Sequence, residues 1–356
     1  MSRDVDILQA NAIGLLKQLI ATPSFSKEED NSSSLIKTFL ETHGIKTEKF
    51  LYNIWAKNKH FDETKPTILL NSHHDTVKPN KGYTLDPFAA IEKDGKLFGL
   101  GSNDAGGSLV SLIATFLYFY DKENLKYNII LAATAEEEIS GHNGIEVLLP
   151  QLGKMDFAIV GEPTQMQMAV AEKGLMVLDC TANGKAGHAA REEGENSIYK
   201  AITDIEWFNS YKFDKVSDLL GPVKMSVTVI ETDNKAHNVV PAQCKFVVDC
   251  RVNELYTFEE MLDIIKTNVQ SEIKPRSTRL RSSSIALDHP IVEAGLKMKR
   301  RCYGSPTTSD KALMHFPSLK IGPGDSARSH TADEYIYIDE IKEGIELYIQ
   351  LLNEII

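Results

Sequence analysis

Long apolar runs, paired cysteines and clusters of basic residues are all missing from this sequence, and each absence excludes a class of protein. No apolar run is long enough to cross a bilayer, and the opening residues MSRDVDILQA lack the apolar core of a signal peptide. The four cysteines are not arranged as C-x-x-C, so neither a zinc ribbon nor a disulfide framework is indicated. We therefore predict a cytoplasmic protein that does not associate with a membrane.

The charge balance is acidic. The chain has 39 Lys and Arg against 50 Asp and Glu, which gives a formal net charge of −11. This balance argues against nucleic acid as a main partner. The 356 residues are 42% hydrophobic and 25% charged, typical of a globular protein, and at about 150 residues per domain they predict two domains. A metabolic enzyme or a small-molecule binder fits this composition.

Helical and strand patterns alternate in the first half of the chain. Residues 5–20 and 108–120 have helical apolar spacing, whereas 67–70, 127–133 and 157–160 are short unbroken apolar runs. Apolar strands separated by helices are typical of a sheet that is covered on both faces. We predict an α/β domain with a mixed sheet and helices on both faces.

The rhythm changes at about residue 172. The pattern predicts a strand at residues 174–184, a helix at 197–211 and two alternating strands at 223–231 and 242–252. A helix that begins with a Thr257–Glu260 capping box and a strand at 279–286 follow. This order is that of a ferredoxin-like α+β unit.

The α/β pattern then resumes, so the ferredoxin-like unit is predicted to be an insertion. A helix is expected at 290–303, a short strand at 319–322 and a terminal helix from residue 339. The predicted boundaries are 1–171 and 285–356 for the catalytic domain and 172–284 for the inserted lid domain.

Polar residues follow the apolar strands of the first domain. His73 and Asp75 follow the first strand, Glu137 and Glu138 the second, and Glu162 the third. His330 lies in the loop after the fourth strand, and Asp104 lies where a glycine-rich loop, GLGSNDAGG, opens a helix. Ligands bind at the carboxyl ends of strands in open α/β sheets. Imidazoles and carboxylates gathered there suit zinc, cobalt or manganese.

Each of these motifs has a simpler alternative. An H-x-D motif is often an ordinary surface pair, a Glu-Glu-Glu run is often a solvated charge run, and Asp104 could only cap a helix. The metal-site hypothesis depends on four strand ends all having ligand-type residues.

The sequence resembles the acetylornithine deacetylase/succinyl-diaminopimelate desuccinylase family of dinuclear metallohydrolases, which includes carboxypeptidase G and aminoacylase-type enzymes. The resemblance covers essentially the whole chain. It depends on eight segments that follow one another in this order: SHHDTVKP, YTLDPFAAIEKDGKLFGLGSNDAGG, TAEEEISGHNG, VGEPT, GKAGHAA, NVVPAQ, DCR and GPGDSARSHTADEYI. It implies a zinc-peptidase-like catalytic domain with a lid that commonly also forms a homodimer contact.

The resemblance assigns two divalent metal ions, zinc first and cobalt or manganese as alternatives. His73 and Glu162 would bind one ion, His330 and Glu138 the other, and Asp104 would bridge both. The family also has a cis peptide directly after the bridging aspartate.

Five further residues match positions that act in the family. Glu137 would be the general base, Asp75 would orient the imidazole two residues before it, and His188 of the lid would help to stabilise the oxyanion. Asn238 and Arg251 would contact the substrate and its carboxylate. As alternatives, Asn238 could cap a turn and Arg251 could form a salt bridge within a strand.

The implied activity is hydrolysis of the amide bond of an N-acyl amino acid. The compact chain and its GPGDSARSHTADEYI segment resemble the acetylornithine deacetylase branch most. This branch includes relatives acting on acetylcitrulline or succinylated equivalents and belongs to arginine biosynthesis. The alternatives are a succinyl-diaminopimelate desuccinylase, a dipeptidase with the same metal centre, and a non-catalytic binding protein.

Overall fold

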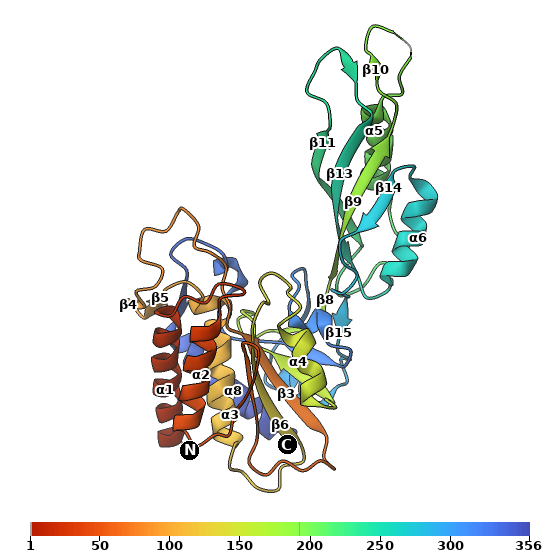
Figure 1. Cartoon of the computed structure of the whole chain (residues 1–356). Helices are drawn as coiled ribbons and strands as arrows, with labels where there is room; N and C mark the ends of the chain where they lie inside the picture. Colours follow the sequence, from red (N-terminus) through yellow and green to blue (C-terminus); the bar gives the residue numbers. More distant parts are fainter. Residues whose placement is uncertain (1, 192) are drawn as a thin grey trace. The chain divides into compact units, whose positions relative to one another are not determined.

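The computed structural model describes residues 2–191 and 193–356, which form two units, each with its own hydrophobic core (Figure 1). The first unit contains the residues up to Val170 together with Ser284–Tyr303 and Ser309–Ile356. The second unit contains Ala171–Ser283 and the short segment Gly304–Thr308. The second unit is therefore inserted within the sequence of the first.

A nine-stranded mixed sheet forms the centre of the first unit. Its order is β1-β2-β6-β3-β7-β17-β8-β15, with β16 paired to β8. These strands are β1 (Glu48–Phe50), β2 (Asn53–Lys57), β3 (Thr67–His73), β6 (Asn128–Thr134), β7 (Phe157–Val160), β8 (Met168–Glu172), β15 (Ser283–Ser284), β16 (Cys302–Ser305) and β17 (Ser318–Lys320). A separate small sheet pairs β4 (Ile91–Lys93), β5 (Lys96–Phe98) and β18 (Tyr335–Tyr337).

Four neighbouring strands of the large sheet are parallel. β3 pairs in parallel with both β6 and β7, and β7 pairs in parallel with β17. All seven residues of β3 and of β6 are buried, as expected for strands that are covered on both faces. The carboxyl ends of these four strands consequently lie along one edge of the sheet.

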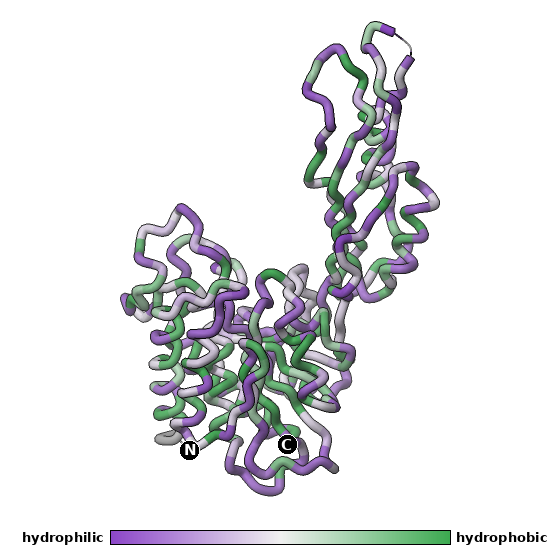
Figure 2. Tube along the Cα trace, in the orientation of Figure 1, coloured by the Kyte–Doolittle hydropathy of each residue, from purple (hydrophilic) through white to green (hydrophobic). Residues whose placement is uncertain are grey.

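Helices complete the first unit. They are α1 (Ser2–Ile20), α2 (Asp30–Thr42), α3 (Gly107–Phe119), α4 (Ile145–Leu152), α7 (Pro290–Lys297) and α8 (Ile338–Asn353). Helix α3 packs against β3 and β6 and also contacts α1 and α8. Its residues are apolar nearly all round, and the core in Figure 2 is correspondingly hydrophobic. Among the described helices, none combines the length and apolarity needed to span a bilayer.

The second unit is an antiparallel sheet with two helices. The sheet order is β11-β13-β9-β14, and chain order places α5 after β9 and α6 after β13, which is the ferredoxin-like arrangement. Buried residues alternate along β9, so one face of the sheet packs on the second core. The elements are β9 (Gly174–Asn183), β10 (Gly187–His188), α5 (Ser197–Ser210), β11 (Lys224–Thr232), β12 (Val239–Val240), β13 (Gln243–Val252), α6 (Phe258–Asn268) and β14 (Glu272–Pro275).

Two predicted elements differ from the structure. The last strand of the inserted unit was expected at residues 279–286 but is β14, where Ile273 packs against the second core and pairs with Cys180. The helix expected at 290–303 ends at Lys297 because Lys299 is in the left-handed region, with φ of 60°, and the chain then enters β16. The spacing of apolar residues alone indicated neither the position of β14 nor the end of α7.

The predicted capping box at the start of α6 provides a test of the inserted unit. Thr257 accepts the backbone N–H of Glu260, and the Glu260 side chain accepts that of Thr257. We expect Thr257→Ala to lower the free energy of unfolding by about 1 kcal/mol, as loss of an N-cap usually does. Thr257→Ser keeps the hydroxyl and is the control. Urea unfolding measures both variants, and an equal loss in the two would show that the cap is not the cause.

Candidate active site

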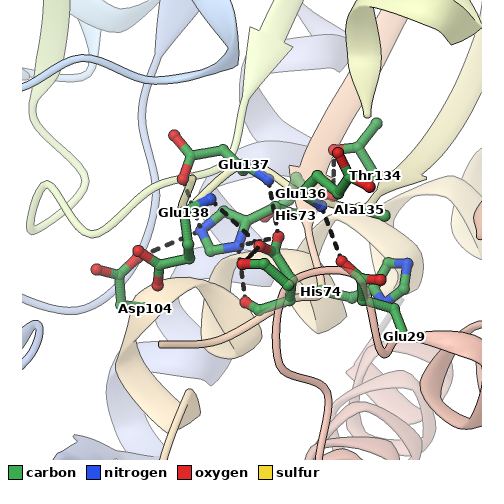
Figure 3. Close-up of polar contacts among 12 residues, drawn as sticks. Glu29, His73, His74, Asp104, Thr134, Ala135, Glu136, Glu137 and Glu138 are labelled. Atoms are coloured by element: carbon green, nitrogen blue, oxygen red, sulfur yellow. Dashed lines mark hydrogen bonds and ion pairs between the residues drawn. The ribbon is translucent and has the colours of Figure 1, made fainter. Parts of the chain in front are cut away.

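The predicted ligand residues come together at the carboxyl edge of the parallel strands. His73 is the last residue of β3, Glu137 and Glu138 follow β6, and Glu162 follows β7. His330 is in the loop between β17 and β18, with a φ of 60° that non-glycine residues adopt rarely. Figure 3 shows the carboxylates of residues 104, 137 and 138 around the imidazole of residue 73. Residues that end or follow four different strands thus form one site.

Asp104 is presented by a tight turn directly before α3. Gly101 has a φ of 73°, and a Cβ there would lie 2.5 Å from Thr76 Cγ2, so this position requires glycine. The Asp104–Ala105 peptide is cis, as the family resemblance implied. The glycine-rich loop therefore holds the aspartate in a fixed turn rather than simply capping the helix.

Three carboxylates lie near one face of the buried imidazole. His73 Nε2 is 3.4 Å from Asp104 Oδ1, 3.8 Å from Glu162 Oε1 and 3.9 Å from Glu137 Oε2. This nitrogen is buried and has no hydrogen-bond partner among the described residues. An unpartnered buried nitrogen facing several carboxylates is suited to a cation between them.

The second histidine faces the same group of carboxylates. His330 Nε2 is 2.9 Å from Glu138 Oε2 and 3.6 Å from Asp104 Oδ2. Asp104 therefore has one carboxylate oxygen toward each histidine. This is the placement expected of a carboxylate shared by two ions.

The donor atoms form two sets. Those of His73, Asp104 and Glu138 lie within 4.8 Å of one another, and so do those of His73, Glu137 and Glu162. Imidazole nitrogen with carboxylate oxygen is a donor set typical of zinc and similar divalent metals. The residues present therefore fit a metal centre.

Electrostatics around the first histidine agree with this fit. Burial disfavours protonation of His73, but contacts with Asp104 and Asp75 and the charges of Glu137 and Glu162 outweigh it and raise its pKa well above the usual value. The surrounding carboxylates thus stabilise positive charge at this nitrogen. A divalent cation would supply that charge in place of a proton.

Glu137 has the electrostatic environment of a proton acceptor. Burial raises its pKa well above the usual value; the charge of His73 opposes this, and the carboxylates of Glu162, Asp310 and Glu138 add to it. A carboxylate with a raised pKa is a stronger proton acceptor than an ordinary one. This property suits general acid–base chemistry.

Asp75 supports the site differently from what the H-x-D motif suggested. His73 Nδ1 bonds to the main-chain carbonyl of Asp75 at 3.0 Å, whereas the Asp75 carboxylate is 3.4 Å away. That carboxylate accepts the backbone N–H groups of Glu137 and Glu138 and the hydroxyl of Ser26. Asp75 therefore connects the first histidine to the loop that presents both glutamates.

Two acidic residues of the site were not predicted from the sequence. Asp310 is buried, accepts a hydrogen bond from Thr134 Oγ1 at 2.8 Å, and has its pKa raised by burial to about 6. Glu334 is buried beside Asp104. Burial and the charge of that aspartate raise its pKa to about 8, although three backbone hydrogen bonds act in the opposite direction and lower it. Neither residue follows an apolar strand, so strand-end placement gave no signal for them.

The remaining predicted residues are in the second unit. His188 on β10 and Asn238 next to β12 lie close together, because Ala189 N donates to Asn238 O and the two strands pair. His188 Nδ1 accepts the N–H of Ala190, so the neutral ring has its proton on Nε2 and can donate it. Arg251 forms two hydrogen bonds to Asp249 in the same strand, which is the salt bridge considered as its alternative.

The affinity of the site for a divalent cation is expected to increase with pH. The hydrogen bond to Glu138 raises the pKa of His330 to about 9, with further contributions from the charges of Asp104 and Glu334. Below that pH the ring is protonated and must lose its proton to bind a metal, so this residue contributes roughly a tenfold gain per pH unit.

Calorimetric titration of the metal-free protein with cobalt between pH 6.5 and 8.5 would measure this dependence. His330→Gln removes the titrating ring and is expected to reduce the slope by about one proton. Equal slopes in the two proteins would contradict the assignment.

Comparisons with known proteins agree with this geometry. Residues 69–354 match the model of peptidase family M20/M25/M40. The succinyl-diaminopimelate desuccinylase 2 of a Ruegeria species is 24% identical, with 96% of this chain and 94% of that protein covered. The succinyl-diaminopimelate desuccinylase of Rickettsia bellii is 27% identical, with 95% of each covered.

A solved structure shows the same fold. It is the Bacillus subtilis YXEP protein, described as a dinuclear metal-binding peptidase of the M20 family, with a TM-score of 0.76, 16% identity and 98% of each chain covered. The family match spans most of the chain and includes the strand ends where the histidines and carboxylates meet. The chain belongs to peptidase family M20/M25/M40 and is a dinuclear metallohydrolase of that family.

Proposed function

We propose that this metallohydrolase cleaves the amide bond of an N-acyl amino acid, with Glu137 as the general acid–base. The observation that carries the proposal is the position of Glu137, whose carboxylate is 3.9 Å from His73 Nε2 and whose pKa is raised by burial. A proton acceptor is thereby placed directly beside the donor set for the metal ions.

The ligand roles are part of this proposal. His73 and Glu162 would hold one ion, His330 and Glu138 would hold the other, and Asp104 would contribute to both. Zinc is the first candidate, and cobalt or manganese are alternatives. When bound, such ions polarise a carbonyl oxygen and lower the pKa of water toward neutrality.

The residues of the chain then complete the reaction. Glu137 accepts a proton from the attacking water while the water oxygen forms a bond to the acyl carbon. It returns this proton to the amide nitrogen as the carbon–nitrogen bond breaks, which yields a carboxylic acid and an amine; the acid then loses its proton to the amine or to solvent. Asp75 keeps Glu137 in place through the backbone bond described above. His188, with a donor Nε2, is proposed to stabilise the oxyanion, and Asn238 and Arg251 to contact the substrate.

For the substrate we propose N-acetylornithine first, with N-acetyl- or N-succinylcitrulline and N-succinylornithine as close variants, in arginine biosynthesis. The motifs of the chain, above all GPGDSARSHTADEYI, support this branch. A second candidate is N-succinyl-diaminopimelate, which the names of the Ruegeria and Rickettsia relatives favour. Dipeptides are the third possibility to test. A homodimer formed through the inserted unit stays a prediction.

Replacing the proposed base tests its role directly. We expect Glu137→Gln to lower kcat by 10²–10⁴-fold, the usual contribution of a general acid–base, while both metal ions are retained. Glu136→Gln makes the same chemical change one residue earlier, where the carboxylate bonds to Asn143, and should reduce kcat much less. Steady-state kinetics with metal analysis measures both. Near-normal turnover by Glu137→Gln would remove it from the mechanism.

A substrate panel tests the proposed class. The purified protein with added zinc or cobalt should hydrolyse at least one of N-acetylornithine, N-acetylcitrulline, their succinyl equivalents and N-succinyl-diaminopimelate. A kcat/KM at least tenfold higher for one compound would identify the branch. Cleavage of dipeptides alone would contradict the N-acyl proposal, and no hydrolysis with two ions bound would favour a binding protein.

A further inference from the structure

Glu334 is a buried carboxyl group to which no role has been assigned so far. It is 2% exposed and lies four residues after His330, directly before β18. Burial of a carboxyl group is costly unless it is hydrogen-bonded, so its contacts indicate what it does.

Among the described residues, the donors to its carboxylate all lie in the loop that presents Asp104. Its Oε1 accepts the backbone N–H groups of Asn103 and Asp104, each at 2.9 Å, and its Oε2 accepts that of Gly101 at 3.1 Å. Its main-chain carbonyl accepts the N–H of Gly99 at 2.9 Å. One residue therefore fixes four backbone donors within six positions, including the donor of the proposed bridging ligand itself.

This loop has little freedom to adjust if those bonds are lost. Gly106 N donates to Gly101 O at 3.0 Å, and a Cβ at Gly106 would lie only 2.3 Å from that oxygen. A shift at Asn103 or Asp104 must therefore change the turn as a whole.

The same loop also contacts the segment that leads to His330. The side chain of Asn103 donates to Asp325 O at 3.0 Å and accepts the N–H of Asp325 at 3.0 Å. Asp325 lies five residues before His330, and Glu334 lies four residues after it. The Asp104 loop is thus bonded to the chain on both sides of the second histidine.

We propose that Glu334 is a positioning residue for the metal centre, which sets the distance between Asp104 and His330 by holding their two loops together. It contacts neither the metal ions nor the substrate. It acts through the backbone of Asp104, whose carboxylate reaches both histidines. The inference depends on the proposed ligand roles of Asp104 and His330 and is independent of the substrate.

The neighbouring residue provides a matched control. Asp333 also accepts three hydrogen bonds, from the N–H and hydroxyl of Thr84 and from the N–H of Leu85, at 2.8, 2.5 and 2.9 Å. These bonds fix residues 84–85, which include no proposed ligand. Asp333→Asn therefore removes a similar number of bonds from the same segment without releasing Asp104.

Metal affinity in the absence of substrate tests the proposal. Glu334→Gln replaces one carboxylate oxygen that accepts backbone N–H groups with an NH2 group. Asp333→Asn makes the same replacement in the neighbouring residue. Calorimetric titration of metal-free protein with zinc, together with cobalt absorption spectra, would give the affinity of each ion. We expect Glu334→Gln to weaken binding of at least one ion by 10–100-fold, as loss of a residue that orients metal ligands usually does, and to change the cobalt spectrum. Asp333→Asn should lower the melting temperature but keep affinities within about twofold.

Two results would overturn the proposal. One is normal metal affinity and an unchanged cobalt spectrum in Glu334→Gln, and the other is an equal loss of affinity in Asp333→Asn, which would indicate general destabilisation. If Glu334→Gln does not fold, Glu334→Asp keeps the carboxylate with a shorter reach and should show intermediate affinity. Loss of hydrolysis with unchanged metal affinity would contradict this inference and leave the proposed function standing.

Discussion

Mutual repulsion of crowded carboxylates with little exposure to solvent is the constraint on which this site depends. Four of them, at positions 104, 137, 138 and 162, converge near His73, where low solvent exposure makes like charges costly. Parallel strands bring them together, and the glycine-rich turn and the bonds of Asp75 keep them from separating. Positive charge compensates for this repulsion, and the divalent cations of a dinuclear centre would supply it.

Much of this arrangement could be predicted because it follows from short-range patterns. Unbroken apolar runs indicated strands that are covered on both faces, and the polar residues after them were predicted to meet at one edge, as His73 and Glu162 do. The capping box of Thr257 identified the start of α6 in the same local way. These signals involve a few consecutive residues and require no knowledge of tertiary contacts.

Other features depend on contacts between distant segments, which no local pattern shows. Glu334 bonds to residues more than 200 positions earlier, and its sequence context, ADEYI, resembles an ordinary exposed turn. The Asp75 carboxylate lies 3.4 Å from Nδ1 of His73, the residue it was predicted to contact, but its bonds to the backbone of Glu137 and Glu138 had no signal in the sequence. Strand β14 was misplaced because its pairing with β9 decides its position, not its composition.

Anomalous diffraction from crystals grown with zinc or cobalt would test the central claim most directly. The account predicts two strong peaks per chain, one contacted by His73 and Glu162 and the other by His330 and Glu138, with Asp104 contacting both and Glu137 contacting neither. A single peak, no peak, or a peak ligated by Glu137 in place of Glu162 would contradict it.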